Sequence, residues 1–328
     1  MEVVRGVRVL VVNVGSSSLK LSVVDAGATI AAATDERLEA FVEHAGAIDA
    51  VGHRVVHGGT EFTEAVVVDD AVLARIEALS PLAPLHQPSA VAAIRRSRAL
   101  VPDVPHVACF DTAFHHTIPA AAVTYALPAE WRARWPVRRF GFHGLSHSHA
   151  ARAGAALVGR PVEDLRIVTA HLGSGASLCA VERGRSVDTT MGMTPLDGLV
   201  MATRPGSLDP GLLIWLQEHA GLGAAEIGAA LERGSGLRGL CGTGDMRAVL
   251  DRRAGGDPDA TLAFDVYVHR LRQGIAAMTA SMGGRDLLVY TGGVGEHAAE
   301  VRDAAGCDHV VVEAREDLEI ARQVAATV

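Results

Sequence analysis

The chain has 328 residues, more than one hydrophobic core usually holds, which indicates two domains of roughly 100 to 200 residues each. Hydrophobic residues make up 49% of the chain and charged residues 21%, which excludes a disordered chain and a coiled coil. The 30 basic and 38 acidic side chains give a net charge of −8 without a basic run, so nucleic acid and anionic membranes are not expected as partners. No apolar stretch approaches the roughly 20 residues of a membrane helix and no leader is apparent, so we expect a cytoplasmic protein.

A strand, a turn of small residues and a second strand open the chain. Residues 7–14 are β-branched and apolar, residues 15–18 supply the turn, and apolar side chains alternate from 19 to 25, which predicts a β-hairpin. The same pattern recurs at 167–181. Because the turn glycines Gly15 and Gly173 lie 158 residues apart, the sequence predicts an internal duplication of an α/β domain.

Helical periodicity fills the segments between the strands and predicts α/β layers rather than a sandwich or a bundle. The predicted helices include residues 73–79, 89–100, 211–222 and 264–282. A further strand at 286–290 precedes a third turn of small residues. Prolines and tryptophans at 118–136 predict irregular connecting chain and mark the region where we expect the domain boundary.

The cysteines and histidines do not form a recognisable metal site. The four cysteines are widely spaced, lack a CxxC pair and are predicted to be reduced core thiols: Cys109, Cys179, Cys241 and Cys307. His143, His147 and His149 lie close in sequence, but no HExxH pattern supports a zinc site. For a lone histidine, a structural hydrogen bond and a functional role remain open interpretations.

Turns of small residues after strands suit phosphate binding, because no side chain shields their backbone N–H groups. Three such turns in one chain suggest a polyphosphate ligand, although hairpins need the same residues. The chain has neither a Walker GxxxxGK[ST] motif nor a GxGxxG turn that opens a helix after the first strand. P-loop NTPases and simple Rossmann dehydrogenases are therefore not leading hypotheses.

Five polar clusters lie within apolar chain, most of them combining arginine or histidine with glycine. They occupy residues 52–59, 84–88, 110–115, 140–147 and 202–206. Guanidinium groups match both carboxylate and phosphate, so the clusters favour a site for a small anion and a transferring phosphoryl group. A carboxylate such as Asp111 is suited to hold Mg²⁺ or to orient the acceptor.

Together these motifs strongly resemble the acetokinase (acetate kinase) family of the actin-like ATPase and sugar kinase superfamily. They follow the family order and span nearly the whole chain, at residues 13–20, 53–59, 110–115, 142–147, 171–175, 194–199, 244–247 and 292–296. The resemblance implies two duplicated ribonuclease-H-like (actin-like ATPase) α/β domains with a cleft between them. It also implies reversible transfer of the γ-phosphate of ATP to acetate, usually in a homodimer.

The resemblance also implies a domain organisation. Residues 1–112 and 316–328 would form the N-terminal domain on the acyl and phosphate side, with a C-terminal helix closing it. Residues 113–315 would form the second domain, which binds the nucleotide and dimerises.

Positions that match the family imply roles in the transfer. Arg54 and Arg204 would bind the carboxylate and the transferring phosphoryl group. His143 would stabilise the transition state, and Asp111 would assist at the magnesium or the acceptor. The pocket for the acetate methyl group would be lined by apolar residues: Val56, Leu85, Phe142 and Pro195. Such chemistry is reasonable because an ionised carboxylate needs positioned positive charge more than a general base.

The implied cofactors are Mg²⁺ (or Mn²⁺), with ATP or ADP as co-substrate. The metal would be linked to Asn13 and Glu316. The residues implied beside the phosphates are Asn13, Ser16, Ser18 and Lys20 in the first turn and His171, Gly173, Ser174 and Gly175 in the second. In the third turn, the residues implied to bind the nucleotide are Gly292, Gly293, Val294 and Gly295. The residues implied on the adenosine side are Asp245, Met246 and Arg247, together with Gly293.

The chain departs from the family pattern and leaves alternatives open. Only 19 residues separate Glu296 from Glu316, where the family has a longer helix and strand segment, and residues 25–53 are also trimmed. Ser174 and His297 each stand where the family has asparagine. The alternatives are a propionate or butyrate kinase, a pyrophosphate-dependent acetate kinase, and a catalytically silent nucleotide-binding protein.

Overall fold

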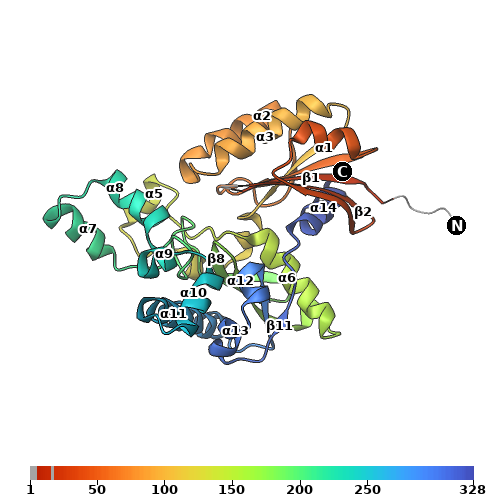
Figure 1. The fold of residues 1–328 in the computed structure, drawn as a ribbon. Coiled ribbons are helices and arrows are strands. Elements are labelled where there is room, and N and C mark those ends of the chain that lie inside the picture. The colour runs from red at the N-terminus through yellow and green to blue at the C-terminus, as the bar shows by residue number, and fades with distance from the viewer. Residues whose placement is uncertain (1–5, 16–17) are drawn as a thin grey trace. The chain divides into compact units, whose positions relative to one another are not determined.

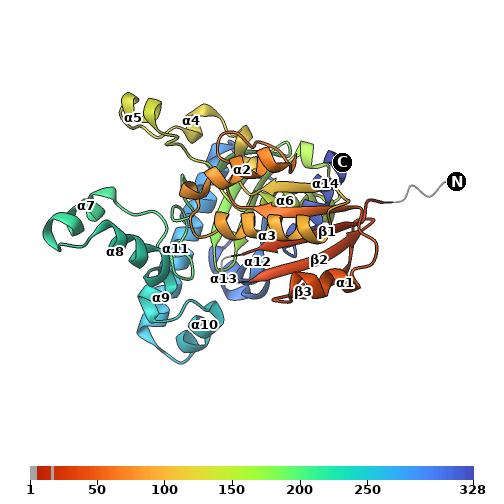
Figure 2. The ribbon, with the colours of Figure 1, turned by 90° about the horizontal axis from the view of Figure 1, so that it is seen from above.

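The computed structural model describes residues 6–15 and 18–328. The chain divides into two compact units, one of Met1–His116, Phe142–His149 and Arg315–Val328, the other of Thr117–Gly141 and Ala150–Ala314. The domains expected from the sequence differ from these units by a few residues at each boundary and by the segment 142–149. Figures 1 and 2 show one sheet in each unit, with helices packed against it.

The sheet of the first unit contains six strands in the order β3-β2-β1-β4-β6-β5. The strands are β1 (Val9–Val14), β2 (Leu19–Asp25), β3 (Ala28–Thr34), β4 (Ala50–Val55), β5 (Val66–Val67) and β6 (His106–Phe110). β1 runs antiparallel to β2, which confirms the predicted hairpin, and β1, β4 and β6 are parallel. The carboxyl ends of these three parallel strands therefore meet at one edge of the sheet.

The sheet of the second unit has five strands in the order β11-β10-β7-β8-β9. They are β7 (Arg166–Leu172), β8 (Ala176–Glu182), β9 (Arg185–Thr189), β10 (Leu287–Thr291) and β11 (Val310–Val311). β7 is antiparallel to β8 and parallel to β10, which is parallel to β11. This order and these directions repeat those of β3-β2-β1-β4-β6, so the predicted duplication of an α/β fold is confirmed.

The predicted helices are present. They correspond to α2 (Asp70–Ala78), α3 (Gln87–Leu100), α7 (Pro210–His219) and α11 (Pro258–Ser281). The other helices are α1 (Leu38–His44), α6 (Gly144–Leu157), α8 (Ala224–Ala229), α9 (Gly236–Cys241), α10 (Met246–Ala254), α12 (Gly292–His297), α13 (Ala299–Ala305) and α14 (Glu316–Thr327).

The segment 118–136 is more regular than its composition predicts. It contains the short helices α4 (Ala120–Val123) and α5 (Ala129–Arg134). Pro119 and Pro128 stand at the N-cap positions of these helices, with φ of −59° and −48°. Proline just before a helix has a φ that suits the helix start, and its missing N–H is not needed there for an intrahelical hydrogen bond. The two prolines therefore start helices here rather than preventing them.

Helix α14 covers one face of the first sheet, while α1, α2 and α3 lie on the other (Figure 1). Ile320 and Val324 of α14 pack against Val9 and Val11 of β1. A Cβ atom at Gly52 of β4 would lie 2.5 Å from the side chain of Ile320, so glycine allows the helix to rest directly on the strand. This contact fixes the beginning of α14, Glu316, beside the carboxyl ends of the strands.

The second sheet is also covered on both faces. A Cβ atom at Gly274 of α11 would lie 2.7 Å from Leu178 of β8, and one at Gly154 of α6 would lie 2.6 Å from Val289 of β10. Leu178 of β8 and Tyr290 of β10 both pair with Ala170 of β7, so their side chains lie on the same face of the sheet, the one that α11 covers. Val289, one residue before Tyr290, lies on the opposite face.

A pair of buried histidines lies beneath α3 in the first unit. The rings of His53 and His106 are stacked with centroids 5.3 Å apart, and Nε2 of His53 lies 3.0 Å from Nδ1 of His106. Nε2 of His106 contacts the carbonyl oxygen of Val101 at 2.9 Å and must therefore carry the proton. His53 then donates through Nε2, and its Nδ1 has no partner among the described residues, so the pair is built for two neutral rings.

Three buried histidines, His53, His57 and His115, make the stability of the first unit depend on pH. Burial lowers the pKa of His53 to about 3 and the pKa values of His57 and His115 to about 4. An unfolded histidine takes up a proton below about pH 6.5, whereas the folded protein does not. Each of the three therefore lowers the free energy of unfolding by about 1.4 kcal/mol per pH unit as the pH falls from 6.5 towards 4.

We predict that His53→Gln reduces this pH dependence by about 1.4 kcal/mol per pH unit. Urea unfolding between pH 5 and 8 measures it, with His44→Gln, at an exposed position of α1, as the control. An unchanged slope in His53→Gln would contradict the neutral state of the buried pair.

Candidate functional site

Three polar side chains end neighbouring strands of the first sheet. Val9 and Val11 of β1 face α14, and the alternation of a strand places Asn13 on the same face. Gly52 of β4 and Cys109 of β6 also face α14. Two residues further along each chain segment, Arg54 and Asp111 therefore lie on the same face. Because β1, β4 and β6 are parallel neighbours, their polar ends converge next to the first residue of α14.

Arg54 is the centre of this cluster. Its Nη2 and Nε donate to the two carboxylate oxygens of Asp111 at 2.7 and 3.1 Å. Its Nη1 donates to Oδ1 of Asn13 at 3.2 Å and lies 3.4 Å from Oε2 of Glu316. Asn13 in turn donates through Nδ2 to Oε2 of Glu316 at 2.7 Å. The structure thus brings together four residues that the sequence analysis assigned to catalysis or to the metal.

The cluster holds two carboxylates for one guanidinium. Burial raises the pKa of Asp111 and Glu316 raises it further, while Arg54 opposes both. Burial lowers the pKa of Arg54, but Asp111 and Glu316 outweigh this effect and raise it overall. With both carboxylates ionised, one negative charge is left uncompensated, and a divalent cation would neutralise it.

His143 lies beside Asp111 through the backbone. Its N–H donates to the Asp111 carboxylate, and the N–H of Gly144 donates to the Asp111 carbonyl oxygen at 2.9 Å. A Cβ atom at Gly144 would lie 2.1 Å from that oxygen, so only glycine fits. The backbone of His143 has φ of +57°, which is a strained conformation for a residue other than glycine. Such strain is common at functional sites.

The residues predicted to line an apolar pocket are not equivalent in the structure. Val56 and Phe142 are buried in the first unit, with exposed fractions of 6% and 1%. Leu85 is 48% exposed in that unit, and Pro195 belongs to the second unit. The first unit therefore buries two of the four predicted lining residues.

The first turn lies beside this cluster. Lys20 is paired with Asn13 across β1 and β2, which places both on one face of the sheet, and Lys20 is exposed. Ser18 is partly buried, and its carbonyl oxygen accepts from the N–H of Gly15 at 2.8 Å. Ser16 lies outside the described residues.

The second unit contains a cavity of about 800 Å³ where its turns of small residues meet α10. Seven residues predicted to bind the nucleotide line it: Gly173, Ser174, Asp245, Met246, Arg247, Gly293 and Val294. The other predicted residues of these turns, His171, Gly175, Gly292 and Gly295, adjoin the cavity in sequence but do not line it. We call this cavity the donor pocket, because the sequence analysis expects the phosphoryl donor to bind there.

Several residues of the donor pocket were missed by the sequence analysis as contacts. The charged or titratable ones are Arg238 of α9 and His297 of α12. Arg238 lies in the run Gly234-Ser235-Gly236-Leu237-Arg238-Gly239, and a basic side chain among small residues is the signal that could have found it. Arg238 and Arg247 together give the pocket two guanidinium groups, which suit a polyphosphate.

Asp245 has a structural role in the pocket wall. Its side chain accepts from the backbone N–H of Arg247 at 3.0 Å and is the N-cap of α10. The side chain of Arg247 also pairs with it at 3.3 Å, and this hydrogen bond is the main cause of a lowered Asp245 pKa. A change at Asp245 therefore affects α10 as well as any ligand, and Asn is the substitution that retains the cap.

Arg204 lies on a loop that follows β9. Its Nη1 donates to the carbonyl oxygen of Pro195 at 2.7 Å, and burial lowers its pKa while Glu232 opposes this effect. Arg139 anchors the same loop, because its Nη1 lies within 3.0 Å of three carbonyl oxygens, those of Thr189, Thr190 and Met191. The loop that presents Arg204 thus depends on a guanidinium distant in sequence.

We predict that Arg139→Gln lowers the free energy of unfolding by about 2 kcal/mol, since buried carbonyl groups lose a charged donor. Urea denaturation of the variant measures this loss. Arg132→Gln, at an exposed arginine of α5 with one backbone hydrogen bond, is the matched control. Equal stabilities of the two variants would show that Arg139 does not anchor the loop.

Comparison with known proteins agrees with this geometry. A sequence profile described as the Acetokinase family matches residues 28–320. The "Acetate kinase" of Clavibacter michiganensis subsp. michiganensis is 52% identical over 270 residues, which cover 81% of this chain and 68% of that protein. The "Acetate kinase" of Leifsonia xyli subsp. xyli is 47% identical, with coverage of 90% of this chain and 85% of that protein.

Solved structures show the same fold. A propionate kinase from Francisella tularensis superimposes with a TM-score of 0.91 at 32% identity, covering 98% of this chain and 100% of that one. The Porphyromonas gingivalis acetate kinase gives a TM-score of 0.89 at 33% identity, covering 97% of this chain and 99% of that one. The predicted two-domain, actin-like ATPase fold is therefore confirmed.

Proposed function

The chain belongs to the acetokinase family, and on this basis we propose that it transfers the γ-phosphoryl group of ATP reversibly to acetate. The products would be acetyl phosphate and ADP. The observation that carries the proposal is the cluster of Asn13, Arg54, Asp111 and Glu316, in which one guanidinium and three oxygen-bearing side chains converge. Such a cluster can bind both an anion and the metal that accompanies a nucleotide.

The chemistry requires positive charge at defined positions. A carboxylate oxygen of acetate attacks the γ-phosphorus in line, and the bond from phosphorus to the ADP oxygen breaks. Both reactants are anions, so we assign Arg54 and Arg204 to neutralise the carboxylate and the transferring phosphoryl group. His143 is assigned to stabilise charge that develops in transfer, and the strained backbone at this residue supports a functional role.

The polar cluster of the first unit fits Mg²⁺. Magnesium prefers oxygen ligands and is usually held by one or two carboxylates, with waters and substrate phosphates completing the shell. Glu316 and Asn13 would hold it, while Asp111 keeps Arg54 in place. When bound, the ion would neutralise phosphate charge. Among the described residues no group of three His, Cys, Asp or Glu side chains is arranged for a metal. Waters and substrate oxygens would complete the coordination beside Glu316 and Asn13.

The donor pocket supports ATP as the phosphoryl donor. Its volume of about 800 Å³ lies within the range of ligand pockets, and its turns of small residues offer backbone N–H groups. The structural similarity to a propionate kinase supports propionate as a second acceptor, because one methylene in an apolar pocket changes binding by only about 1–3 kcal/mol.

One assay tests the proposed function. Hydroxylamine traps acyl phosphate, and the reaction is run with ATP or pyrophosphate against acetate, propionate and butyrate. The proposal expects acyl phosphate from ATP and acetate with the highest kcat/KM. Product from pyrophosphate alone would reassign the donor, and no product with any pair would support a silent nucleotide-binding protein.

We predict that Arg204→Ala lowers kcat by more than about tenfold, which corresponds to about 1.4 kcal/mol of barrier, because the side chain acts on charge in the transition state. A melting curve recorded beside the assay separates this effect from unfolding. Arg270→Ala, at an exposed arginine of α11, is the control. A smaller loss in Arg204→Ala would remove its assigned role.

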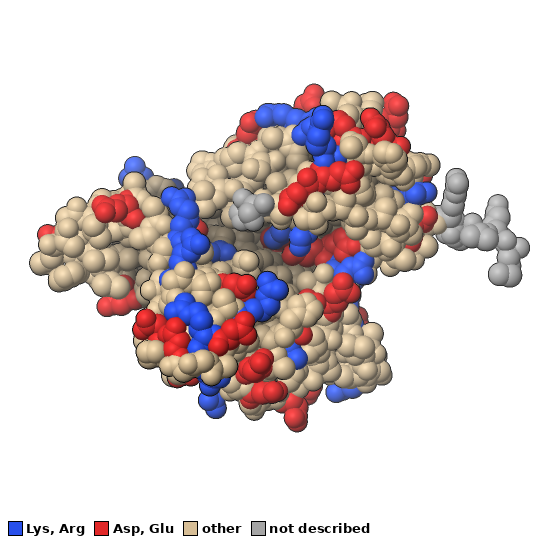
Figure 3. All heavy atoms as spheres, viewed as in Figure 1, with Lys and Arg blue, Asp and Glu red and all other residues tan. Residues whose placement is uncertain are grey.

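We also propose that the protein is a homodimer that buries α7. No side chain of this helix is buried, and Leu212, Ile214 and Trp215 are 42%, 55% and 53% exposed. In Figure 3 the region of α7 and α8 is largely uncharged. Exposed apolar patches of this kind mark interaction surfaces, and a second copy supplies an equally apolar helix.

Trp215→Glu should then shift the protein to monomers, because a charge would be buried in the apolar contact. Light scattering across a range of concentrations measures the mass. Trp131→Glu is a matched control, since Trp131 of α5 is 49% exposed. If Trp215→Glu keeps the mass of the parent, α7 is not the interface.

A further inference from the structure

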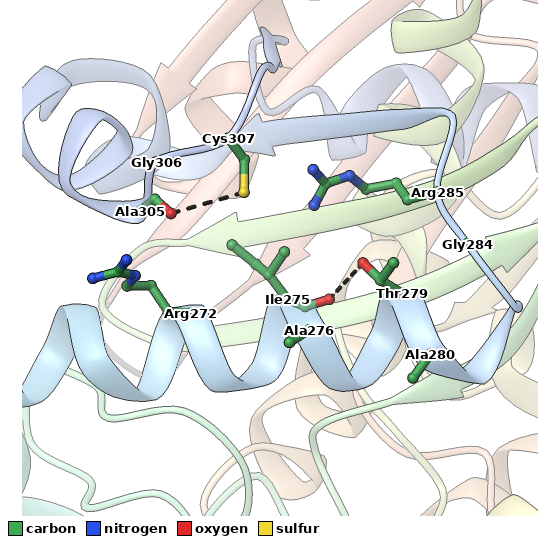
Figure 4. A pocket seen from close by; sticks show the side chains of 10 residues that line it. All are labelled: Arg272, Ile275, Ala276, Thr279, Ala280, Gly284, Arg285, Ala305, Gly306 and Cys307. Carbon is green, nitrogen blue, oxygen red and sulfur yellow. Dashed lines mark hydrogen bonds between the residues drawn. The ribbon is translucent and has the colours of Figure 1, made fainter.

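A second cavity of the second unit lies apart from the donor pocket. It has a volume of about 580 Å³ and is formed by α11, by the turn before β10 and by the end of α13 (Figure 4). It shares no lining residue with the donor pocket. Gly284 and Arg285 in its wall precede β10, whereas Gly293 of the donor pocket follows that strand. The two cavities therefore lie at opposite ends of β10.

Two arginines line this cavity, Arg272 of α11 and Arg285 before β10. Within the described residues neither guanidinium forms an ion pair, whereas neighbouring Asp286 is already bound by Arg166 at 3.1 Å. In Figure 4 the Arg285 side chain extends into the space above Ile275, and Arg272 reaches towards Ala305. The cavity thus offers two cationic groups without a protein anion to satisfy them.

Apart from Arg272, the face of α11 that lines the cavity consists of small or apolar residues and of Thr279, whose hydroxyl donates to the carbonyl oxygen of Ile275 at 2.7 Å. Residues spaced three and four apart along α11 present one face to the cavity, namely Arg272, Ile275, Ala276, Thr279 and Ala280. Tyr290 of β10 has its side chain on the α11 face of the sheet, and its buried hydroxyl has no hydrogen-bond partner among the described residues. A ligand with a short carbon skeleton would have an apolar surface on which to lie.

A short connection after α13 forms one edge of this cavity. Helix α13 ends at Ala305 and β11 begins at Val310, so only four residues connect them. Gly306, in the left-handed region with φ of +73°, turns the chain and places Cys307 at the cavity. The trimmed segment noted in the sequence, between Glu296 and Glu316, falls in this region.

We propose that this cavity binds a small dianionic metabolite, a phosphomonoester or a dicarboxylate, through Arg272 and Arg285. Two guanidinium groups match two negative charges, and guanidinium binds phosphate and carboxylate through the same paired donors. The apolar face of α11 would contact the carbon part of the ligand. This site does not rest on the proposed phosphotransfer, because none of its residues has a role in it.

Cys307 provides a direct readout of occupancy. It is the one partly exposed cysteine, while Cys109, Cys179 and Cys241 are buried. N-ethylmaleimide, an uncharged reagent that the arginines do not attract, would label Cys307 first. Mass spectrometry of the labelled peptide identifies the site. Inorganic phosphate and succinate serve as probes of the two ligand sources, with sodium chloride at matched ionic strength as the reference.

We expect phosphate or succinate to slow labelling of Cys307 about threefold or more at saturation, and chloride to leave it unchanged. Arg272→Gln and Arg285→Gln should each weaken the protecting anion about tenfold or more, because each removes a charge-assisted hydrogen bond. Arg270→Gln, on the same helix outside the cavity, should retain the parental affinity. Protection by only one probe would identify whether phosphate or carboxylate is recognised.

The proposal is wrong if neither anion changes the labelling rate, or if both arginine variants remain protected as strongly as the parent. Arg247→Ala separates this site from the donor pocket, since it removes a guanidinium of that pocket alone. Loss of protection in Arg247→Ala would assign the anion effect to the donor pocket and overturn the second site. A chain without kinase activity that still shows arginine-dependent protection would support the second site while rejecting the phosphotransfer.

Discussion

The buried pair of Arg54 and Asp111 is the interaction on which the polar edge of the first unit depends. A carboxylate that is 1% exposed is costly to ionise without a partner, and the bidentate guanidinium supplies one. Because Arg54 also contacts Asn13 and Glu316, the same side chain connects three strands to α14. The contacts that join the sheet to α14 therefore also hold the polar side chains of the site in place.

The two halves of the duplication share strand order but carry different chemistry at equivalent positions. Asn13 near the end of β1 corresponds to His171 near the end of β7, 158 residues later. In the first unit the strand ends hold charged side chains that face α14. In the second unit the turns after β7 and β10 are made of small residues and border an open cavity. One fold thus provides both a charged cluster and a backbone-lined pocket.

Sequence patterns predicted what depends on local periodicity. The hairpin and the repeat follow from alternation and from turn residues. Arg54 and Asp111 lie in polar clusters that stand out within apolar chain, whereas Asn13 was assigned only from the family resemblance. Arg238 matches none of the quoted family motifs, and it was missed as a pocket residue because the packing of α9 brings it to the donor pocket. The helices within 118–136 were missed because proline at an N-cap starts a helix, whereas proline inside one breaks it. The second cavity, lined by Arg272 and Arg285, depends on tertiary packing between α11 and α13, which no local sequence pattern predicts.

The position of α14 also has a consequence for the order in which the protein is assembled. Its residues complete the core against β1 and β4, which leave the ribosome long before it does. Apolar side chains such as Val9 and Val11 therefore stay uncovered until Ile320 of α14 packs against them. The second unit ends at Ala314, so all of its residues are synthesised before α14. During synthesis, the sheet face that α14 covers is made long before α14 itself, and a nascent chain would need protection of that exposed face until α14 emerges.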